Sequence, residues 1–244
     1  MLFYVLSVLS IVVYGLSSDT GFKLPVTTCK RNSNDYSACL KRVLEKAWPQ
    51  FVAGLPEFDF PPLDPLFYKY GKIIFNSNDI HAEVISSNLS GIGLSKTRFS
   101  DVRTHFLDDI FGLEIDAQVP RIFLEAAVKI NGTLNVFRIV NEGNLSVTAN
   151  DMRGTCNLTG HVVNDTWIVE HFRIAPSIGK FKVSFDNLFE DNKELNNLVI
   201  TFVNEYWPII YREVLPFLSD VADPWLVEFT NKFFSKVPFS KIFP

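Results

Sequence analysis

Histidines are the first residues to consider for chemistry, because they act as general bases and metal ligands near neutral pH. The sequence has four, at His81, His105, His161 and His171. None has the H-x-x-x-H or C-x-x-C spacing of a zinc site, and the chain has no G-x-S-x-G nucleophile elbow. His161 and His171 lie at unequal distances from Asn164-Asp165, so they are not direct partners across a hairpin there. The four residues are therefore interpreted as surface histidines.

Two other segments resemble functional motifs only in part. Gly91-Ile92-Gly93-Leu94-Ser95 lacks the third glycine and the lysine of a phosphate-binding loop, so an ordinary turn is expected. Asp108 and Asp109 are adjacent, which is typical of a solvated loop or a helix cap and not of an acid/base pair. The residues predict no enzyme activity, no metal and no cofactor.

The three cysteines fit an oxidising compartment. Cys29 and Cys39 flank a polar stretch that resembles a helix start, and a bridge between them would tie the N-terminal segment to the first helix. Cys156 remains unpaired and alternates with Leu158 on an apolar strand face. A buried, inert thiol is favoured there over an intermolecular bridge.

The N-terminus has the features of a secretory leader. Residues 1–17 are mostly apolar, carry no charged side chain and end in small residues, which predicts a cleaved signal peptide; an uncleaved anchor is the alternative. Residues 18–244 then form the mature domain. Five N-x-S/T sequons fit secretion and predict glycosylation, at Asn88, Asn131, Asn144, Asn157 and Asn164.

Composition limits the classes of partner. With 47% hydrophobic and 20% charged residues the chain has material for a sizeable core. A net charge of −4 without a basic run argues against nucleic acid and anionic lipid, and no segment after the leader predicts stable membrane insertion. Phe is used 23 times, which is the unusual feature of the composition.

Helical spacing occurs at both ends of the chain. Apolar residues from Leu40 to Leu55 fall on one face, after an N-cap at Asn34 or Asp35, and Gly54 with Pro56 ends this helix. A second apolar stripe covers residues 195–233, where three prolines eight residues apart predict a curved or segmented helix.

Between them, residues of about 70 to 186 alternate with period two. Residues 111–119, 122–130, 145–149 and 181–185 read as half-buried strands. Turns are expected at Asn131-Gly132, Gly143, Asn164-Asp165 and Gly179, which gives an antiparallel meander. The predicted fold class is α+β, with a strongly twisted antiparallel sheet around a long curved C-terminal helix and an additional N-terminal helix.

The excess of aromatic residues has a general and a specific interpretation. The general one is a filled core; the specific one is an elongated apolar tunnel between the sheet and the helices. The expected lining is Trp48, Phe51, Leu55, Tyr68, Phe111, Leu113, Ile115, Leu124, Val128, Phe181, Val183, Phe202, Tyr206, Trp207, Ile210 and Phe217. Candidates for a polar atom inside the tunnel are Tyr68, Tyr206, Tyr211, Trp48 and Trp207.

Several motifs resemble the insect takeout / juvenile-hormone-binding protein family, over essentially the whole mature chain. The N-terminal motifs are Cys29-Lys30-Arg31, Cys39-Leu40-Lys41, Gly54-Leu55-Pro56-Glu57-Phe58 and Pro61-Pro62-Leu63-Asp64-Pro65-Leu66. The C-terminal motifs are Asn187-Leu188-Phe189, Leu195, Asn196, Asn204-Glu205-Tyr206-Trp207 and Pro216. The proline-rich segment after a two-cysteine helix start is the specific part of the resemblance.

The resemblance implies a tubular lipid-binding fold with an internal tunnel. It also implies a secreted carrier of juvenile hormone or another hydrophobic ligand, with links to feeding, circadian or chemosensory physiology. Blood-borne hormone-binding members carry a second disulfide, for which Cys156 has no partner, so the chain looks nearer to the takeout branch.

Three function classes remain as hypotheses. The first is a secreted, non-enzymatic carrier of a small elongated hydrophobic ligand, with a receptor as a possible further partner. The alternative is an extracellular glycosylated interaction protein with a packed core and no ligand; a lipid hydrolase ranks third.

Overall fold

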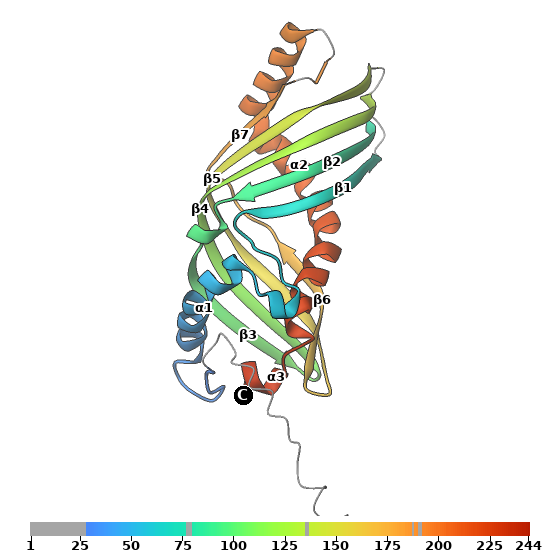
Figure 1. The fold of residues 1–244 in the computed structure, drawn as a ribbon. Coiled ribbons are helices and arrows are strands. Elements are labelled where there is room, and N and C mark those ends of the chain that lie inside the picture. Colours follow the sequence, from blue (N-terminus) through green and yellow to red (C-terminus); the bar gives the residue numbers. More distant parts are fainter. Residues whose placement is uncertain (1–27, 77–79, 135–136, 187, 190–191) are drawn as a thin grey trace, which may run out of the picture.

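The computed structural model describes residues 28–76, 80–134, 137–186, 188–189 and 192–244 (Figure 1). The predicted leader, residues 1–17, lies outside the described residues. The elements are α1 (Tyr36–Ala53), η1 (Pro56–Phe58), β1 (Leu66–Asn76), β2 (Ile80–Ile92), η2 (Leu94–Lys96), β3 (Arg98–Leu107), β4 (Ile110–Leu134), β5 (Phe137–Val163), β6 (Thr166–Ile174), β7 (Lys180–Phe185), α2 (Lys193–Phe234) and α3 (Phe239–Ile242). This order confirms the predicted α+β class.

The sheet is built around the long antiparallel pair β4 and β5, which is in register from Ile110 opposite His161 to Leu134 opposite Phe137. The first half of β4 pairs with β3 and its second half with β2, which in turn pairs with β1. Likewise, β5 pairs first with β7 and then with β6. One half of the β4–β5 pair is therefore flanked by β3 and β6, and the other half by β2 and β7.

The two halves meet at a backbone irregularity. Val119 pairs with Met152 and Arg121 with Asn150, so Pro120 stands opposite Asp151, which has a φ of +53°. Proline cannot donate a ladder hydrogen bond, and such positions mark bulges and bends in strands. The strands change direction between the two halves, and the sheet curls around α2 (Figure 1).

The turn at Asn164-Asp165 is confirmed, since both residues have a left-handed φ, of 49° and 60°, between the paired residues Val163 and Thr166. These are the angles of the two-residue hairpin turn that asparagine and aspartate favour. Gly179 also lies in the connection between β6 and β7, as predicted.

The predicted turns at Asn131-Gly132 and Gly143 are wrong. Asn131 and Gly132 lie inside β4, and Gly143 lies inside β5 opposite Val128. A Cβ on Gly132 would come within 2.4 Å of the His81 carbonyl oxygen, so this glycine allows close approach of β2 to β4. The same residue type that favours turns here serves strand packing.

The helix predictions hold. α1 begins after Asp35 and ends at Gly54, which has a φ of +88°, and Pro49 lies within it. α2 is one continuous helix of 42 residues despite Pro208, Pro216 and Pro224, and its length is about 63 Å at 1.5 Å per residue. The alternative of a segmented helix is therefore wrong. Among the described residues, no helix combines the length and apolar character that crossing a membrane requires.

Candidate functional site

The candidate site is formed by the side chains that the curled sheet and α2 turn toward each other. Three aromatic pairs connect the two surfaces: Phe75 with Phe217, Tyr68 with Trp225, and Phe181 with Trp207, with ring centroids 4.6, 5.7 and 5.7 Å apart. β1 and β7 lie at opposite edges of the sheet. These pairs therefore contact α2 from two sides.

Asparagine side chains fix α2 to the outer edges of β6 and β7. The Asn231 amide accepts from the Val169 N–H at 2.9 Å and donates to the Val169 carbonyl at 2.7 Å. Asn204 makes the same pair of bonds with Val183, at 2.7 and 2.8 Å. Each amide thus takes the place of a neighbouring strand, which satisfies backbone groups that an edge strand leaves open.

Further polar contacts extend this seam along α2. The buried Asn196 donates to the Phe185 carbonyl at 3.0 Å, and the Tyr211 hydroxyl donates to the Pro176 carbonyl at 2.6 Å. These bonds, together with those of Asn204 and Asn231, hold α2 in a fixed register against β6 and β7.

Asp223 adds a charged contact to the seam. It accepts from the Phe172 N–H at 2.6 Å and lies 3.0 Å from Nδ1 of His171. Burial disfavours the ionised carboxylate, but the Phe172 N–H and the His171 imidazole outweigh burial and hold the pKa of Asp223 below its usual value.

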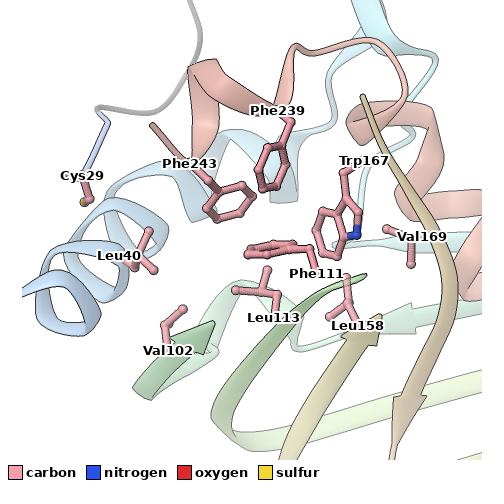
Figure 2. Packing of buried hydrophobic residues seen from close by; sticks show 10 residues of the cluster. All are labelled: Cys29, Leu40, Val102, Phe111, Leu113, Leu158, Trp167, Val169, Phe239 and Phe243. Atoms are coloured by element: carbon pink, nitrogen blue, oxygen red, sulfur yellow. The ribbon is translucent and has the colours of Figure 1, made fainter. Parts of the chain in front are cut away.

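The lower end of the interior, next to α3, is closed by a packed aromatic core (Figure 2). Phe111 is fully buried and contacts the rings of Trp167, Phe239 and Phe243 at 4.8, 4.9 and 4.7 Å. Leu113 is buried in the same cluster and Ile115 packs against it. The structure thus places these three predicted lining residues in a closed core.

A second cluster closes the side where α1 meets the C-terminal part of α2. Leu55 is buried there, and the Phe51 ring packs against Phe233 at 5.1 Å. Trp48 packs against the same cluster and donates from Nε1 to the Leu94 carbonyl at 2.9 Å. These three predicted lining residues also belong to packed core.

Eight more predicted lining residues lie further up the interior and are less enclosed. Val128 is buried in a small cluster with Ala126 and Phe185. The others are half-buried: Tyr68, Leu124, Phe181, Val183, Trp207, Ile210 and Phe217. They come from β1, β4, β7 and α2, so the four elements present apolar groups that are not fully covered by protein.

Two predicted lining residues are at the surface. Phe202 is 55% exposed and Tyr206 is 48% exposed, and their rings pack on each other with centroids 4.8 Å apart. The expectation that they face an enclosed interior is wrong, because the apolar stripe of α2 extends around more of the helix than its interior face.

Five side chains were candidates for a polar atom inside the tunnel, and the structure shows three of them in another environment. The Trp48 indole and the Tyr211 hydroxyl already donate to backbone carbonyls, and Tyr206 is exposed. Burial also raises the pKa of Tyr211. Tyr68 and Trp207 remain as the predicted candidates beside half-buried apolar side chains.

Three of the four histidines, His105, His161 and His171, lie beside carboxylates. His161 Nδ1 lies 3.0 Å from Glu170, and His105 lies 3.5 Å from Glu114. Asp108 and Asp109 occupy the exposed β3–β4 turn, as expected of a loop. Within the described parts of the chain, His, Cys, Asp and Glu side chains form no group of three that could hold a metal ion.

The turn predicted for Gly91–Ser95 is present only in its second part, because Gly91 and Ile92 still belong to β2. It leads from β2 into η2, and Gly93 has a φ of +121°. The Gly93 and Ser95 N–H groups donate to the Asp64 carboxylate at 3.1 and 2.7 Å. The proline-rich segment after α1 is thereby fixed to the end of β2.

The Cys29–Cys39 disulfide is present, which confirms the predicted pairing. Cys156 is a free thiol that packs against the lower core. Burial raises its pKa to about 11, so the protonated thiol dominates at neutral pH and a nucleophilic role is disfavoured.

All five sequon asparagines are exposed. Asn131, Asn144 and Asn157 are on strands β4 and β5, Asn88 is in β2, and Asn164 is in the β5–β6 turn. Asn157 also borders a depression of about 140 Å³ over Gly112, on the outer side of the sheet. The interior and the four sequons on strands therefore use opposite faces of the sheet, and Asn164 lies at its end.

Sequence reasoning missed Phe75, Trp225 and the asparagines of the α2 seam. Trp225 was already on the predicted helical stripe. Phe75 lies two residues after Ile73 and therefore on the same face of β1. The seam has a weaker signal: Asn196 and Asn204 are eight residues apart, as are Asp223 and Asn231. Polar residues at this spacing share a helix face, but their strand partners are visible only in three dimensions.

Comparison with known proteins agrees with this architecture. The family model described as haemolymph juvenile hormone binding protein matches residues 6–244. The circadian clock-controlled protein daywake of Drosophila yakuba is 21% identical, over 98% of this chain and 94% of that protein. Its Drosophila melanogaster counterpart is 22% identical, over 96% of this chain and 93% of that protein.

A solved structure shows the same fold. Takeout 1 of Epiphyas postvittana superposes with a TM-score of 0.72 over 89% of this chain and 99% of that chain, at 20% sequence identity. The curled antiparallel sheet, the N-terminal helix and the long C-terminal helix are thus shared with a protein of known structure.

Proposed function

Because the chain belongs to the haemolymph juvenile hormone binding protein family, which includes the takeout proteins, we propose that it is a secreted carrier of one small elongated hydrophobic molecule. The ligand lies in a tunnel between the concave face of the sheet and α2. One observation carries the proposal: the apolar side chains of this region remain half-buried, whereas those at the lower end form a closed core.

The lining that supports the proposal comes from both walls. Tyr68, Leu124 and Phe181 belong to the sheet, and Trp207, Ile210 and Phe217 to α2. A ligand that buries about 400 Å² of apolar surface gains ~10 kcal/mol at ~25 cal/mol/Å², before association costs of at least ~4 kcal/mol. The ~6 kcal/mol that remains at most corresponds to a dissociation constant of tens of micromolar, so apolar contacts of this area already give measurable binding, and a larger buried area would tighten it.

The ligand class is an extended terpenoid, a fatty acid or a similar chain, and juvenile hormone is one member of this class. The Tyr68 hydroxyl and the Trp207 indole are the groups that would orient a polar atom of the ligand. One such hydrogen bond contributes about 1 kcal/mol, so it sets orientation more than affinity.

The binding test uses delipidated protein and a fluorescent fatty-acid probe. The expected result is saturable binding with ~1:1 stoichiometry, displacement by terpenoid or acyl ligands, and a change in tryptophan fluorescence from Trp207 and Trp225. Ile210→Asp places a charge in the lining and is expected to weaken binding, whereas Phe67→Asp on the exposed outer side of β1 is the control. If terpenoid and acyl ligands do not displace the probe saturably, the proposal is wrong.

The identity of the ligand requires a separate experiment. Native purification followed by mass spectrometry reads the length and the head group of any retained molecule directly. A co-purified small molecule that displaces the fluorescent probe supports the proposal that the protein is a carrier.

Secretion and processing form part of the same proposal. We expect cleavage after the leader at residues 1–17, a mature domain of residues 18–244, and N-linked glycans on sequon asparagines, all of which are exposed. Peptide mapping of the secreted protein, with and without glycosidase, tests both points. The exposed sequons also fit the alternative, a glycosylated interaction protein without a ligand, which the displacement experiment distinguishes.

A physiological role in feeding, circadian or chemosensory function is also proposed. Two relatives are named circadian clock-controlled proteins, which supports the circadian part. Transcript levels measured through a day in constant darkness would oscillate if this role is shared, and a flat profile would contradict it.

A further inference from the structure

The first half of α2 carries an exposed apolar surface, which we call the α2 apolar face. It consists of Leu195, Leu198, Phe202, Tyr206 and Ile209, whose side chains are 37%, 67%, 55%, 48% and 55% exposed. Their spacing of three or four residues places them on one side of the helix. Single exposed apolar residues are normal, but a continuous stripe of this kind marks an interaction site.

This face is distinct from the one that anchors α2 to the sheet. Phe202 and Tyr206 are each two residues from Asn204, and Ile209 is two residues from Tyr211, which corresponds to about 200° around a helix of 3.6 residues per turn. Asn204 and Tyr211 bond to β7 and to the segment before it. The α2 apolar face therefore points away from that seam, and the first turns of α2 extend beyond the upper end of the sheet (Figure 1).

The charge around the face restricts the partner. Between Lys193 and Arg212 the charged residues are the two acidic side chains Glu194 and Glu205, and the whole chain has a net charge of −4. Surfaces that attract anionic lipid or acidic protein carry clustered lysine or arginine. The chemistry of the α2 apolar face thus suits an uncharged apolar partner.

The size of the face argues against a folded protein as that partner. About half of the ~200 Å² that a large apolar side chain can expose, for five side chains, is on the order of 500 Å². A stable protein–protein interface needs about 800 Å² from each partner. A lipid surface has no such requirement, since interfacial helices insert only their apolar side, and leucine, isoleucine, phenylalanine and tyrosine are suited to that position.

We propose that the α2 apolar face docks the protein reversibly on a zwitterionic phospholipid surface. The same helix supplies Trp207, Ile210 and Phe217 to the interior, so docking would bring the interior close to the lipid. This inference goes beyond the proposed carrier function and does not depend on it, because vesicle binding is measured without any ligand in the interior.

The test is flotation of the purified protein with phosphatidylcholine vesicles. Saturable binding is expected, with weaker binding to vesicles that contain phosphatidylserine at low salt, because Glu205 and the net negative charge are repelled. The double variant Leu198→Asp/Phe202→Asp is expected to lose at least ~tenfold in affinity, since aspartate strongly disfavours insertion into lipid. Leu107→Asp is the matched control, because Leu107 is 70% exposed in the β3–β4 region at the other end of the sheet.

Each possible result supports or overturns the proposal. Circular dichroism and probe binding are measured on both variants, so that loss of the fold or of the interior is recognised separately. Unchanged flotation of the double variant, or no flotation of the unmodified protein, overturns lipid docking while leaving the carrier function intact. A dimer in sedimentation analysis that the double variant dissociates assigns the face to a second copy and also overturns it.

Discussion

At the scale of single residues, the defining feature is a set of polar side chains that replace a strand. Asn204 and Asn231 each bond to both the N–H and the carbonyl of one residue in β7 or β6. An unpaired buried backbone group costs about 1–3 kcal/mol, so amides at these positions contribute to stability out of proportion to their size. They also explain why a helix with a broad apolar stripe settles in one register.

A pair of neighbouring asparagines tests this idea. Asn196 is buried, donates to the Phe185 carbonyl and accepts from the Leu188 N–H, whereas Asn197 is exposed. Asn196→Ala leaves both backbone groups without their partner and is expected to lower the free energy of unfolding by ~2–3 kcal/mol. Asn197→Ala should cost less than ~0.5 kcal/mol. Equal effects in chemical denaturation would show that the seam does not stabilise the fold.

The carboxylate of Asp223 predicts a pH dependence. Its pKa is lowered in the folded protein by the Phe172 N–H and His171, against the effect of burial. The stabilisation is therefore fully present above the unfolded-state pKa of about 4 and is lost as the pH falls through the folded-state pKa. Asp223→Asn should destabilise by ~1–2 kcal/mol at pH 7 and converge with the unmodified protein at low pH.

The measurement is urea denaturation at a series of pH values. Asp220→Asn is the control, because Asp220 is exposed on the same helix. A stability difference for Asp223→Asn that stays constant down to acidic pH would contradict the assignment.

At the scale of elements, the sequence predicts the helices well and the turns only in part. α1 and α2 follow from 3.6-residue spacing with Gly54 as a stop, because local periodicity reports burial directly. Asn131-Gly132 looks like a hairpin but lies in β4, and the register that overrides it depends on contact with β2. Phe202 and Tyr206 were placed inside for a similar reason, since a stripe on a helix does not tell which part of it the sheet covers.

Two glycines of β4 differ in how closely the neighbouring strand approaches them. A Cβ at Gly132 would lie 2.4 Å from the His81 carbonyl oxygen, whereas the nearest atom to one at Gly112 is 3.7 Å away. Gly132→Ala must push β2 away from β4 and is expected to destabilise by ~2–4 kcal/mol, while Gly112→Ala should change stability by less than ~1 kcal/mol. Thermal unfolding of both variants decides the point, and a well-tolerated Gly132→Ala would mean that β2 does not pack this closely.

At the scale of the whole molecule, the two ends of the sheet differ in how they are filled. The lower end contains two packed clusters, and at the first of them Arg31 bonds to the C-terminal residues: it donates from its backbone N–H to the Pro244 carbonyl and from its side chain to the Phe243 carbonyl. Among its described residues, the upper half has a small buried cluster around Ala126, Val128 and Phe185, while most of its other apolar side chains are half-buried or exposed. One end thus holds the fold together, while the other leaves apolar surface available to a ligand.

This asymmetry predicts a gradient of amide hydrogen exchange. Segments with few buried apolar contacts open at lower free energy, so β1 and β2 should exchange faster than β6 and the second half of β5, which pack on Phe111 and Trp167. A molecule bound between the sheet and α2 would fill the upper half. Its binding free energy would raise the opening free energy only of those segments whose opening releases the molecule. Ligand should therefore slow exchange in β1, β2 and β7 and leave β6 nearly unchanged. Uniform protection of the whole chain, or protection confined to the lower core, would place the ligand elsewhere.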